Sequence, residues 1–246
     1  MYQQPVAAPA INSASDAIGF PFRDPQWVSK ILIQGLINII PVVGLMAGLG
    51  WTLATLDNLR QGRQELAPAG FGHLGRGAGL FVVALVYSAL VGVVFLIFWI
   101  VAVGLTSTRN EALGAIGVIF ILIAYLLAFA GGLALQFAFP TIVLAVDRGG
   151  VGAGLNFAQI LATIRGNSST ALMAGLFSFL LYLIAGFGQI ACFVGFYFTL
   201  AWAMAGLAAV VYWEERNLAP GGGMPAPQAM PPQPPSMPPP PPPPSA

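Results

Sequence analysis

The chain has 246 residues, of which 57% are hydrophobic and only 7% are charged. Because about a quarter of the residues of a soluble domain are charged, so few charges cannot cover a soluble globule of this size. The net charge of +1 gives no electrostatic basis for a nucleic-acid partner, and we expect the lipid bilayer to be the main partner.

Four windows of the chain contain no charged residue, and each exceeds the ~18 residues that indicate a membrane-spanning helix. The last window has 48 residues and would extend about 72 Å as one helix, so it must fold back within a ~30 Å hydrocarbon core. We therefore predict an all-α, polytopic integral membrane bundle with about six hydrophobic helices. The windows are Ile31–Leu56, Gly77–Thr108, Ala112–Val146 and Gly166–Trp213.

The first apolar window follows a short segment rich in charged and aromatic residues. Residues 1–19 are rich in Ala, Pro, Ser and Gln and predict a disordered tail, followed by a membrane domain over residues 20–216. Pro41 lies near the middle of Ile31–Leu56, where it must end or kink a helix. We expect this window to enter the membrane and return as a proline-broken hairpin, whether as two short spans or as a re-entrant loop. One kinked span is the alternative.

The distribution of basic residues favours the returning path. If the window returns, eight basic residues lie on the cytoplasmic side and only Arg109 lies outside, whereas a single crossing leaves six against three. The positive-inside rule thus predicts a multi-pass protein of the cell membrane with both termini in the cytoplasm.

Four longer spans follow a basic loop that ends at Arg76. We expect spans over Gly79–Leu105 and Ala112–Phe139, the second stopped by Pro140, and a closing helical hairpin that turns near 186–189. Between them, Val151–Ile164 has polar residues on one face and apolar residues on the other, which predicts an amphipathic helix in the membrane interface.

The C-terminal segment, residues 217–246, contains fourteen prolines, seven of them in the run Pro238–Pro244. Such a composition favours extended polyproline II and cannot build a core. We expect a disordered tail that is able to bind a protein partner.

Two blocks of the sequence resemble a prokaryotic membrane family known as domain of unknown function 4013. The first runs from Phe20-Pro-Phe-Arg-Asp-Pro-Gln-Trp27 through Ile40-Pro-Val-Val-Gly44 to Asn58-Leu-Arg-Gln-Gly62. The second runs from Gly154-Leu-Asn-Phe157 to Ile164-Arg-Gly-Asn167. The resemblance covers about residues 16–216 and implies a membrane architecture, but it supplies no activity.

Motifs that would indicate an enzyme are weak. Gly70-Phe-Gly-His-Leu-Gly75 matches the G-x-G-x-x-G pattern, but a dinucleotide site also needs a preceding strand and a βαβ unit, and an uncharged span follows instead. His73 is the only histidine and has no acidic residue or cysteine at ligand spacing. We therefore expect no cofactor, no metal and no enzymatic activity.

Two groups of residues are candidates for functional contacts. Three polar residues lie deep in the apolar windows, where interhelical hydrogen bonds are the favoured interpretation and the lining of a polar path is the alternative: Gln34, Asn38 and Gln136. Six basic residues are placed to contact lipid headgroups in one leaflet: Arg23, Lys30, Arg60, Arg63, Arg76 and Arg165. Small residues such as Gly44 and Gly48 predict close helix packing, either within the chain or in a homo-oligomer.

The favoured function is a non-enzymatic scaffold or an accessory component of a membrane complex. The alternative is a channel, small permease or lipid transporter, because broken helices of this kind occur in transporters.

Overall fold

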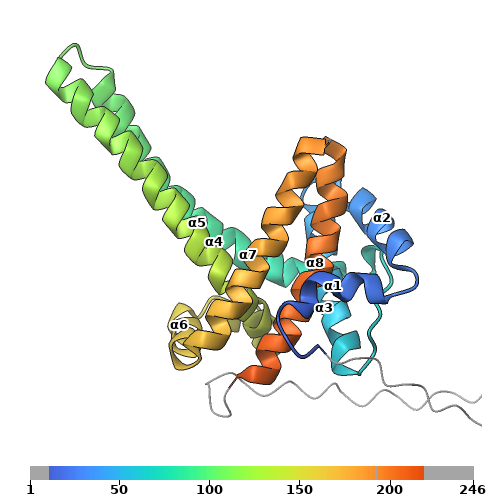
Figure 1. The fold of residues 1–246 in the computed structure, drawn as a ribbon. Helices are drawn as coiled ribbons and strands as arrows, with labels where there is room; N and C mark the ends of the chain where they lie inside the picture. The colour runs from blue at the N-terminus through green and yellow to red at the C-terminus, as the bar shows by residue number, and fades with distance from the viewer. Residues whose placement is uncertain (1–10, 192, 219–246) are drawn as a thin grey trace, which may run out of the picture.

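The computed structural model describes residues 11–191 and 193–218. All regular secondary structure within these residues is helical, and loops join the helices (Figure 1). Eight α-helices and two 3-10 helices follow one another within the described residues. They are α1 (Asp16–Gly19), η1 (Phe20–Arg23), α2 (Trp27–Asn38), α3 (Val43–Arg60), η2 (Phe71–His73), α4 (Leu74–Thr106), α5 (Glu111–Gly154), α6 (Phe157–Gly166), α7 (Ser168–Ala191) and α8 (Phe193–Asn217).

Within these residues, four helices are long and apolar enough to cross a membrane. They are α4, extended at its start by η2, together with α5, α7 and α8. These four correspond to the four longer spans that the sequence predicts. The other two predicted hydrophobic helices, the limbs of the proline-broken hairpin, correspond to α2 and α3. These have 12 and 18 residues and are not among the four.

The predicted break at Pro41 is confirmed, because α2 ends at Asn38 and α3 begins at Val43. The two helices pack tightly where they meet. A Cβ added at Gly44 would lie 2.2 Å from the carbonyl oxygen of Ile37, so a side chain here would push the helices apart. The expected role of this glycine in close packing is therefore confirmed within the chain.

Helices α4 and α5 form a long antiparallel arm that leaves the rest of the molecule. Figure 1 shows the far half of the arm standing away from the α7–α8 hairpin. The 33 residues of α4 extend about 50 Å at 1.5 Å per residue. We call the opposite part of the molecule, where α3, α5, α6 and α8 end, the base.

The expectation that Pro140 stops a helix is wrong. Pro140 lies inside α5, and the helix continues to a break at Gly150, where φ is +71°. Residues 140–146 are all buried against the core, so packing offsets the missing backbone donor of proline. Tertiary contacts thus override a strong local signal.

Two further boundaries differ from the prediction. The glycines at 186 and 188 do not form a turn but lie within α7, which runs to Ala191. Gly188 instead allows close packing on α8, since an added Cβ would lie 2.3 Å from Thr199 Oγ1. The helix predicted over 151–164 begins only at Phe157, after Asn156 caps it by accepting a bond from the N–H of Gln159 (3.1 Å).

The N-terminal segment is partly folded where a disordered tail is expected. Ile11 and Ala17 are buried, and the carboxylate of Asp16 accepts bonds from the backbone N–H of Asn12 (2.9 Å) and Ser13 (3.0 Å). The turn and α1 then pack on α8 near Gly206. Residues 1–10 and the proline-rich tail beyond residue 218 lie outside the described residues.

Candidate functional site

A charged cluster joins four helices at the base. It consists of three arginines and three carboxylates from the ends of α3, α5 and α8 and the start of α4, so its formal charge is zero. We call it the arginine cluster; its members are Asp57, Arg60, Arg76, Asp147, Arg148 and Glu215.

Arg60 is the centre of this cluster. Its Nε and Nη2 donate to the two oxygens of Glu215 at 2.8 and 3.0 Å, which is the bidentate geometry that suits a guanidinium. Its Nη1 donates to Asp147 at 2.6 Å. Burial alone would lower the pKa of Arg60, but the hydrogen bonds and charges of Glu215 and Asp147 raise it above its usual value. The guanidinium therefore stays charged and ties α3 to both α5 and α8.

The remaining arginines complete the cluster around Arg60. Arg76 at the start of α4 pairs with Asp57 and donates to Asp147 at 2.8 Å. Arg148 donates to Glu215 at 2.8 Å. Every carboxylate in the cluster thus pairs with two arginines, and the four helix ends are held at fixed positions.

A second polar contact lies beside the cluster and is fully buried. Thr141 on α5 donates to Glu214 Oε1 on α8 at 2.5 Å. Glu214 Oε2 and Arg148 Nε are buried and have no hydrogen-bond partner among the described residues. The polar layer at the base therefore reaches inward between α5 and α8.

The loop after α3 is fixed by the segment before α2. Asp24 Oδ2 accepts bonds from Lys30 Nζ (2.7 Å) and from the backbone N–H of Leu66 (2.9 Å), and Lys30 Nζ also donates to the carbonyl of Leu66 (2.8 Å). Arg23 Nη1 donates to Gln64 at 2.9 Å. Burial raises the pKa of the Asp24 carboxyl. The bonds from Lys30 and from the backbone N–H groups of Gln26 and Leu66 outweigh this effect, so the pKa of Asp24 lies below its usual value. We call the contact among Asp24, Lys30 and Leu66 the clasp.

The clasp shows that the chain returns after Pro41, because residues before α2 touch residues after α3. The contact favours the returning path over the alternative of one kinked span, which would carry the residues before α2 and those after α3 to opposite sides of a membrane. On which side of a membrane the clasp lies remains a prediction.

The structure brings two of the three predicted intramembrane polar residues together. Gln34 Nε2 donates to Asn38 Oδ1 (3.1 Å) within α2, and Asn38 Nδ2 lies 3.8 Å from Met204 Sδ on α8. Gln136 lies elsewhere and donates to Ser178 on α7 at 3.2 Å. Asn38 and Gln136 thus contact neighbouring helices, as interhelical hydrogen bonds require.

The six basic residues predicted to contact headgroups fall into two sets. Arg23, Lys30, Arg60 and Arg76 are engaged with partners of the same chain, as described above. Arg63 lies in the exposed loop and donates to Gln61 (2.7 Å), and Arg165 is exposed at the end of α6. Headgroup contact remains a prediction for all six.

Sequence reasoning singled out two basic members of the cluster, Arg60 and Arg76, but neither Arg148 nor the three acidic partners. Asp147 and Glu215 each follow a long apolar window. The available signal was that several carboxylates end spans on the same side as Arg60 and Arg76. Their pairing depends on how four separate helix ends converge, which spacing along the chain does not encode.

A cavity in the described part of the chain lies near the start of the arm. Its volume is about 460 Å³, and it opens between α4, α5 and α6. The lining is almost wholly apolar and includes Leu90, Ala134, Ala138, Phe157 and Leu161. We call it the arm cavity. No group of three metal-ligating side chains was found among residues 11–191 and 193–218.

Together, the four apolar helices, the exposed apolar surface of the arm and the charges gathered at helix ends define an all-helical, multi-pass membrane-associated protein. The family described as "Protein of unknown function (DUF4013)" matches residues 33–194, which is more than half of the chain. The chain belongs to this family, as the sequence resemblance predicts. Searches of curated proteins and of solved structures find no match.

Proposed function

We propose that this protein is a non-enzymatic scaffold or accessory component of a complex in the cell membrane. The observation that carries the proposal is the contrast between the base and the arm. The base is fixed by the arginine cluster and the clasp, whereas the arm presents large apolar side chains along two helices, including Leu122, Leu126 and Phe129. A rigid base with a long apolar arm suits a protein that positions partners within a bilayer.

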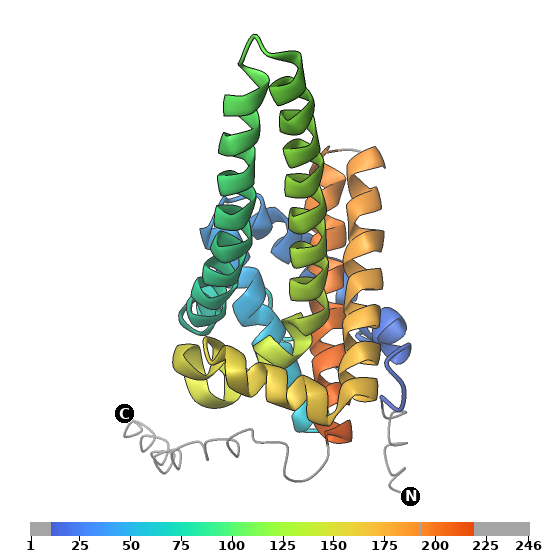
Figure 2. The same ribbon diagram turned by 90° about the vertical axis from the view of Figure 1, so that its left-hand side faces the viewer.

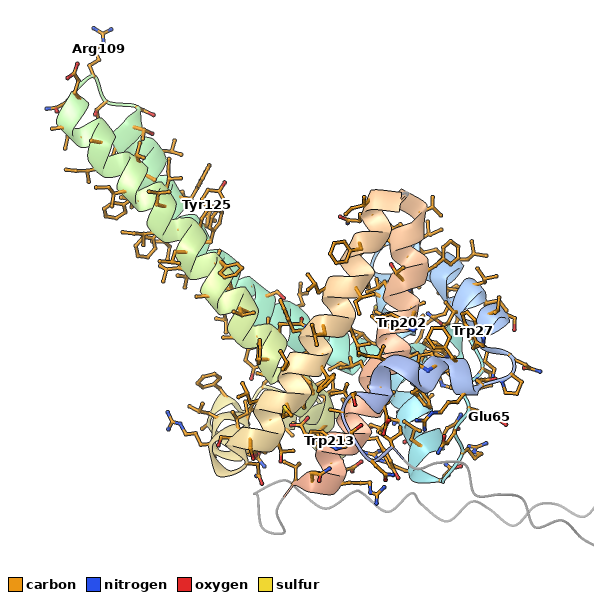
Figure 3. All side chains as sticks on the ribbon, viewed as in Figure 1. Trp27, Glu65, Arg109, Tyr125, Trp202 and Trp213 are labelled. Carbon is orange, nitrogen blue, oxygen red and sulfur yellow. The ribbon has the colours of Figure 1, made fainter. Side chains whose placement is uncertain are left out.

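The outer half of the arm supports a role inside the membrane. Phe95, Trp99 and Tyr125 form an aromatic cluster with ring centroids 5.6–5.8 Å apart. Arg109 marks the tip, beyond this cluster (Figure 3). A charged tip at the end of a long apolar arm is typical of a membrane boundary, so we assign the arm to the bilayer and its tip to the outer face.

The placement of α6 supports the same orientation. Figure 2 shows α6 lying across the base, beneath the long helices. Its 10 residues reach only about 15 Å, which is too short to cross the ~30 Å hydrocarbon core. We therefore place α6 in the cytoplasmic interface, with both termini on that side.

The proline-rich tail supplies the second part of the proposal. Polyproline II segments bind aromatic grooves of partner proteins at a low entropic cost. We assign the tail to partner recruitment in the cytoplasm and the helical domain to anchorage.

The test is affinity purification from native membranes with three forms of the protein. These are the full chain, a form ending at Leu218, and a full-length form in which the run Pro238–Pro244 is replaced by alternating Gly and Ser. The proposal expects a stoichiometric partner with the full chain and its loss from both altered forms. Recovery of no stoichiometric partner with the full chain would overturn it, and so would reproducible solute or lipid flux in liposomes of the purified protein.

A further inference from the structure

The arm cavity has the size and lining of a binding site for a hydrocarbon chain. Its volume of about 460 Å³ lies within the range of ~300–1,000 Å³ that holds small ligands. Small residues on α5, namely Gly131, Ala134 and Ala138, create the hollow, since they recur at helical spacing on one face. A polar ligand would find few partners on these walls.

The cavity is open toward the surroundings of the helices. Two of its lining residues, Leu90 on α4 and Phe157 at the start of α6, are 59% and 63% exposed. Because α4 and α5 belong to the membrane-crossing helices, the medium at this opening is the hydrocarbon of the bilayer. A lipid tail can therefore enter sideways without crossing a polar layer.

A cation that has no ion-pair partner within residues 11–191 and 193–218 stands beside this opening. Leu161 and Ile164 of α6 line the cavity, and Arg165 lies four residues after Leu161, so it projects from the same side of the helix one turn further on. No carboxylate among the residues described here forms an ion pair with Arg165. Its guanidinium remains available to bind an anion, and phosphate suits its fork of donors.

We propose that the arm cavity holds one acyl chain of an anionic phospholipid whose phosphate pairs with Arg165. The lipid fills the space between the arm and α6 and covers apolar side chains that the described part of the chain leaves exposed. The inference does not depend on the scaffold function, because a resident lipid would occupy this site whatever partner the protein recruits.

The test measures lipid retained by the delipidated full-length protein in mild detergent, by native mass spectrometry, during titration with phosphatidylglycerol or phosphatidylcholine. The wild-type protein should bind one phosphatidylglycerol preferentially. Ala134→Phe should lower binding of both lipids at least tenfold, because the exposed side chain at 134 allows a ring to occupy the cavity. Ala115→Phe places the same ring at an exposed position of α5 away from the cavity and should bind as wild type does. Ala138→Phe is a second filling variant in case the first fails to fold.

The headgroup contact has a separate readout. Arg165→Gln should weaken phosphatidylglycerol binding about fivefold, the effect of one basic residue near an anionic surface, and leave phosphatidylcholine binding unchanged. Arg109→Gln, at the opposite end of the arm, should change neither. Equal binding by Ala134→Phe, Ala138→Phe and Ala115→Phe would show that the cavity is empty or holds something other than lipid. An unchanged preference in Arg165→Gln would remove the headgroup contact.

Discussion

The substitution Arg60→Ala tests whether the arginine cluster holds the helix ends together. Arg60 is 25% exposed and its partners Asp147 and Glu215 are 6% and 14% exposed, so the pairs are neither fully buried nor at the surface. Breaking a buried pair costs about 3–5 kcal/mol, and an exposed pair contributes about 0–1 kcal/mol. We expect a loss of about 2–3 kcal/mol in the free energy of unfolding, because Arg76 and Arg148 still neutralise the two carboxylates in part.

Matched variants separate the effect of the cluster from that of removing any arginine. Arg76 is 44% exposed, so Arg76→Ala should cost about 1 kcal/mol or less. Arg63→Ala removes a loop arginine outside the cluster and should leave stability unchanged. Arg60→Lys should fall between Arg60→Ala and wild type, since lysine keeps the charge and loses the bidentate geometry toward Glu215.

The assay is thermal unfolding of the purified protein in detergent, followed by intrinsic tryptophan fluorescence. A loss of about 2–3 kcal/mol corresponds to a fall of roughly 5–10 °C in the midpoint for a chain of this length. In a double-mutant cycle with Glu215→Gln, we expect a coupling energy of about 1–3 kcal/mol. Equal midpoints for Arg60→Ala and Arg63→Ala, or additive effects in the cycle, would refute the reasoning.

Three further predictions follow from the clasp, the helix contacts and the returning path. Asp24→Asn should lower the free energy of unfolding at neutral pH. Because the pKa of Asp24 is lowered in the folded state, this loss is complete above the usual pKa of 3.8 and should vanish as the pH falls through the lower folded pKa. A loss of stability that persists in stronger acid would contradict the prediction. Gly77→Ala should lower the free energy of unfolding by about 1–3 kcal/mol, because the added Cβ would lie 1.7 Å from the Met46 carbonyl oxygen. Gly92→Ala on the same helix meets no atom within 4 Å and should be neutral or slightly stabilising. Similar midpoints of thermal unfolding for the two variants would argue against the α3–α4 packing. With the native cysteine replaced, cysteines at Gln3 and Gln61 should both resist a membrane-impermeant thiol reagent in intact cells, and labelling at Gln3 alone would refute the cytoplasmic placement of the N-terminus.

The sequence predicted the class of fold because that class depends on composition and window length. Charge-free windows of more than 18 residues require helices in a bilayer, and the 48-residue window requires a hairpin whatever its neighbours do. The break at Pro41 was predictable for the same reason, since the loss of a backbone donor acts locally. These features need no knowledge of long-range contacts.

The details that failed depend on contacts between distant segments. Pro140 carries the same local signal as Pro41, yet α5 continues through it because the residues that follow are buried against the core. Gly186 and Gly188 resemble a turn, but Gly188 lies where α7 packs closely on α8. A glycine or proline alone does not distinguish a helix end from a packing contact.

In the candidate sites, too, the features set by local sequence were predictable and those set by long-range contacts were not. The basic residues were visible as a group, because the positive-inside pattern is a property of the sequence. Their partners were not, since Asp147 and Glu215 reach Arg60 from positions 87 and 155 residues away. The arm cavity likewise depends on the angle at which α6 crosses the base, which follows from the positive φ at Gly150 and the Asn156 cap.

The arginine cluster and the arm cavity lie at successive levels of α5, and this order links stability to binding. Residues 131–142 of α5 contribute to the cavity, residues 140–146 are buried in the core, and Asp147 joins the cluster. The ion pairs at Asp147 therefore fix the lower end of the same helix that forms one wall of the cavity. A substitution that releases this end, such as Arg60→Ala, should make the cavity wall more mobile and weaken lipid retention. Ala134→Phe, in contrast, fills the cavity without contacting an ion pair. It should therefore leave the midpoint of thermal unfolding nearly unchanged in lipid-free detergent.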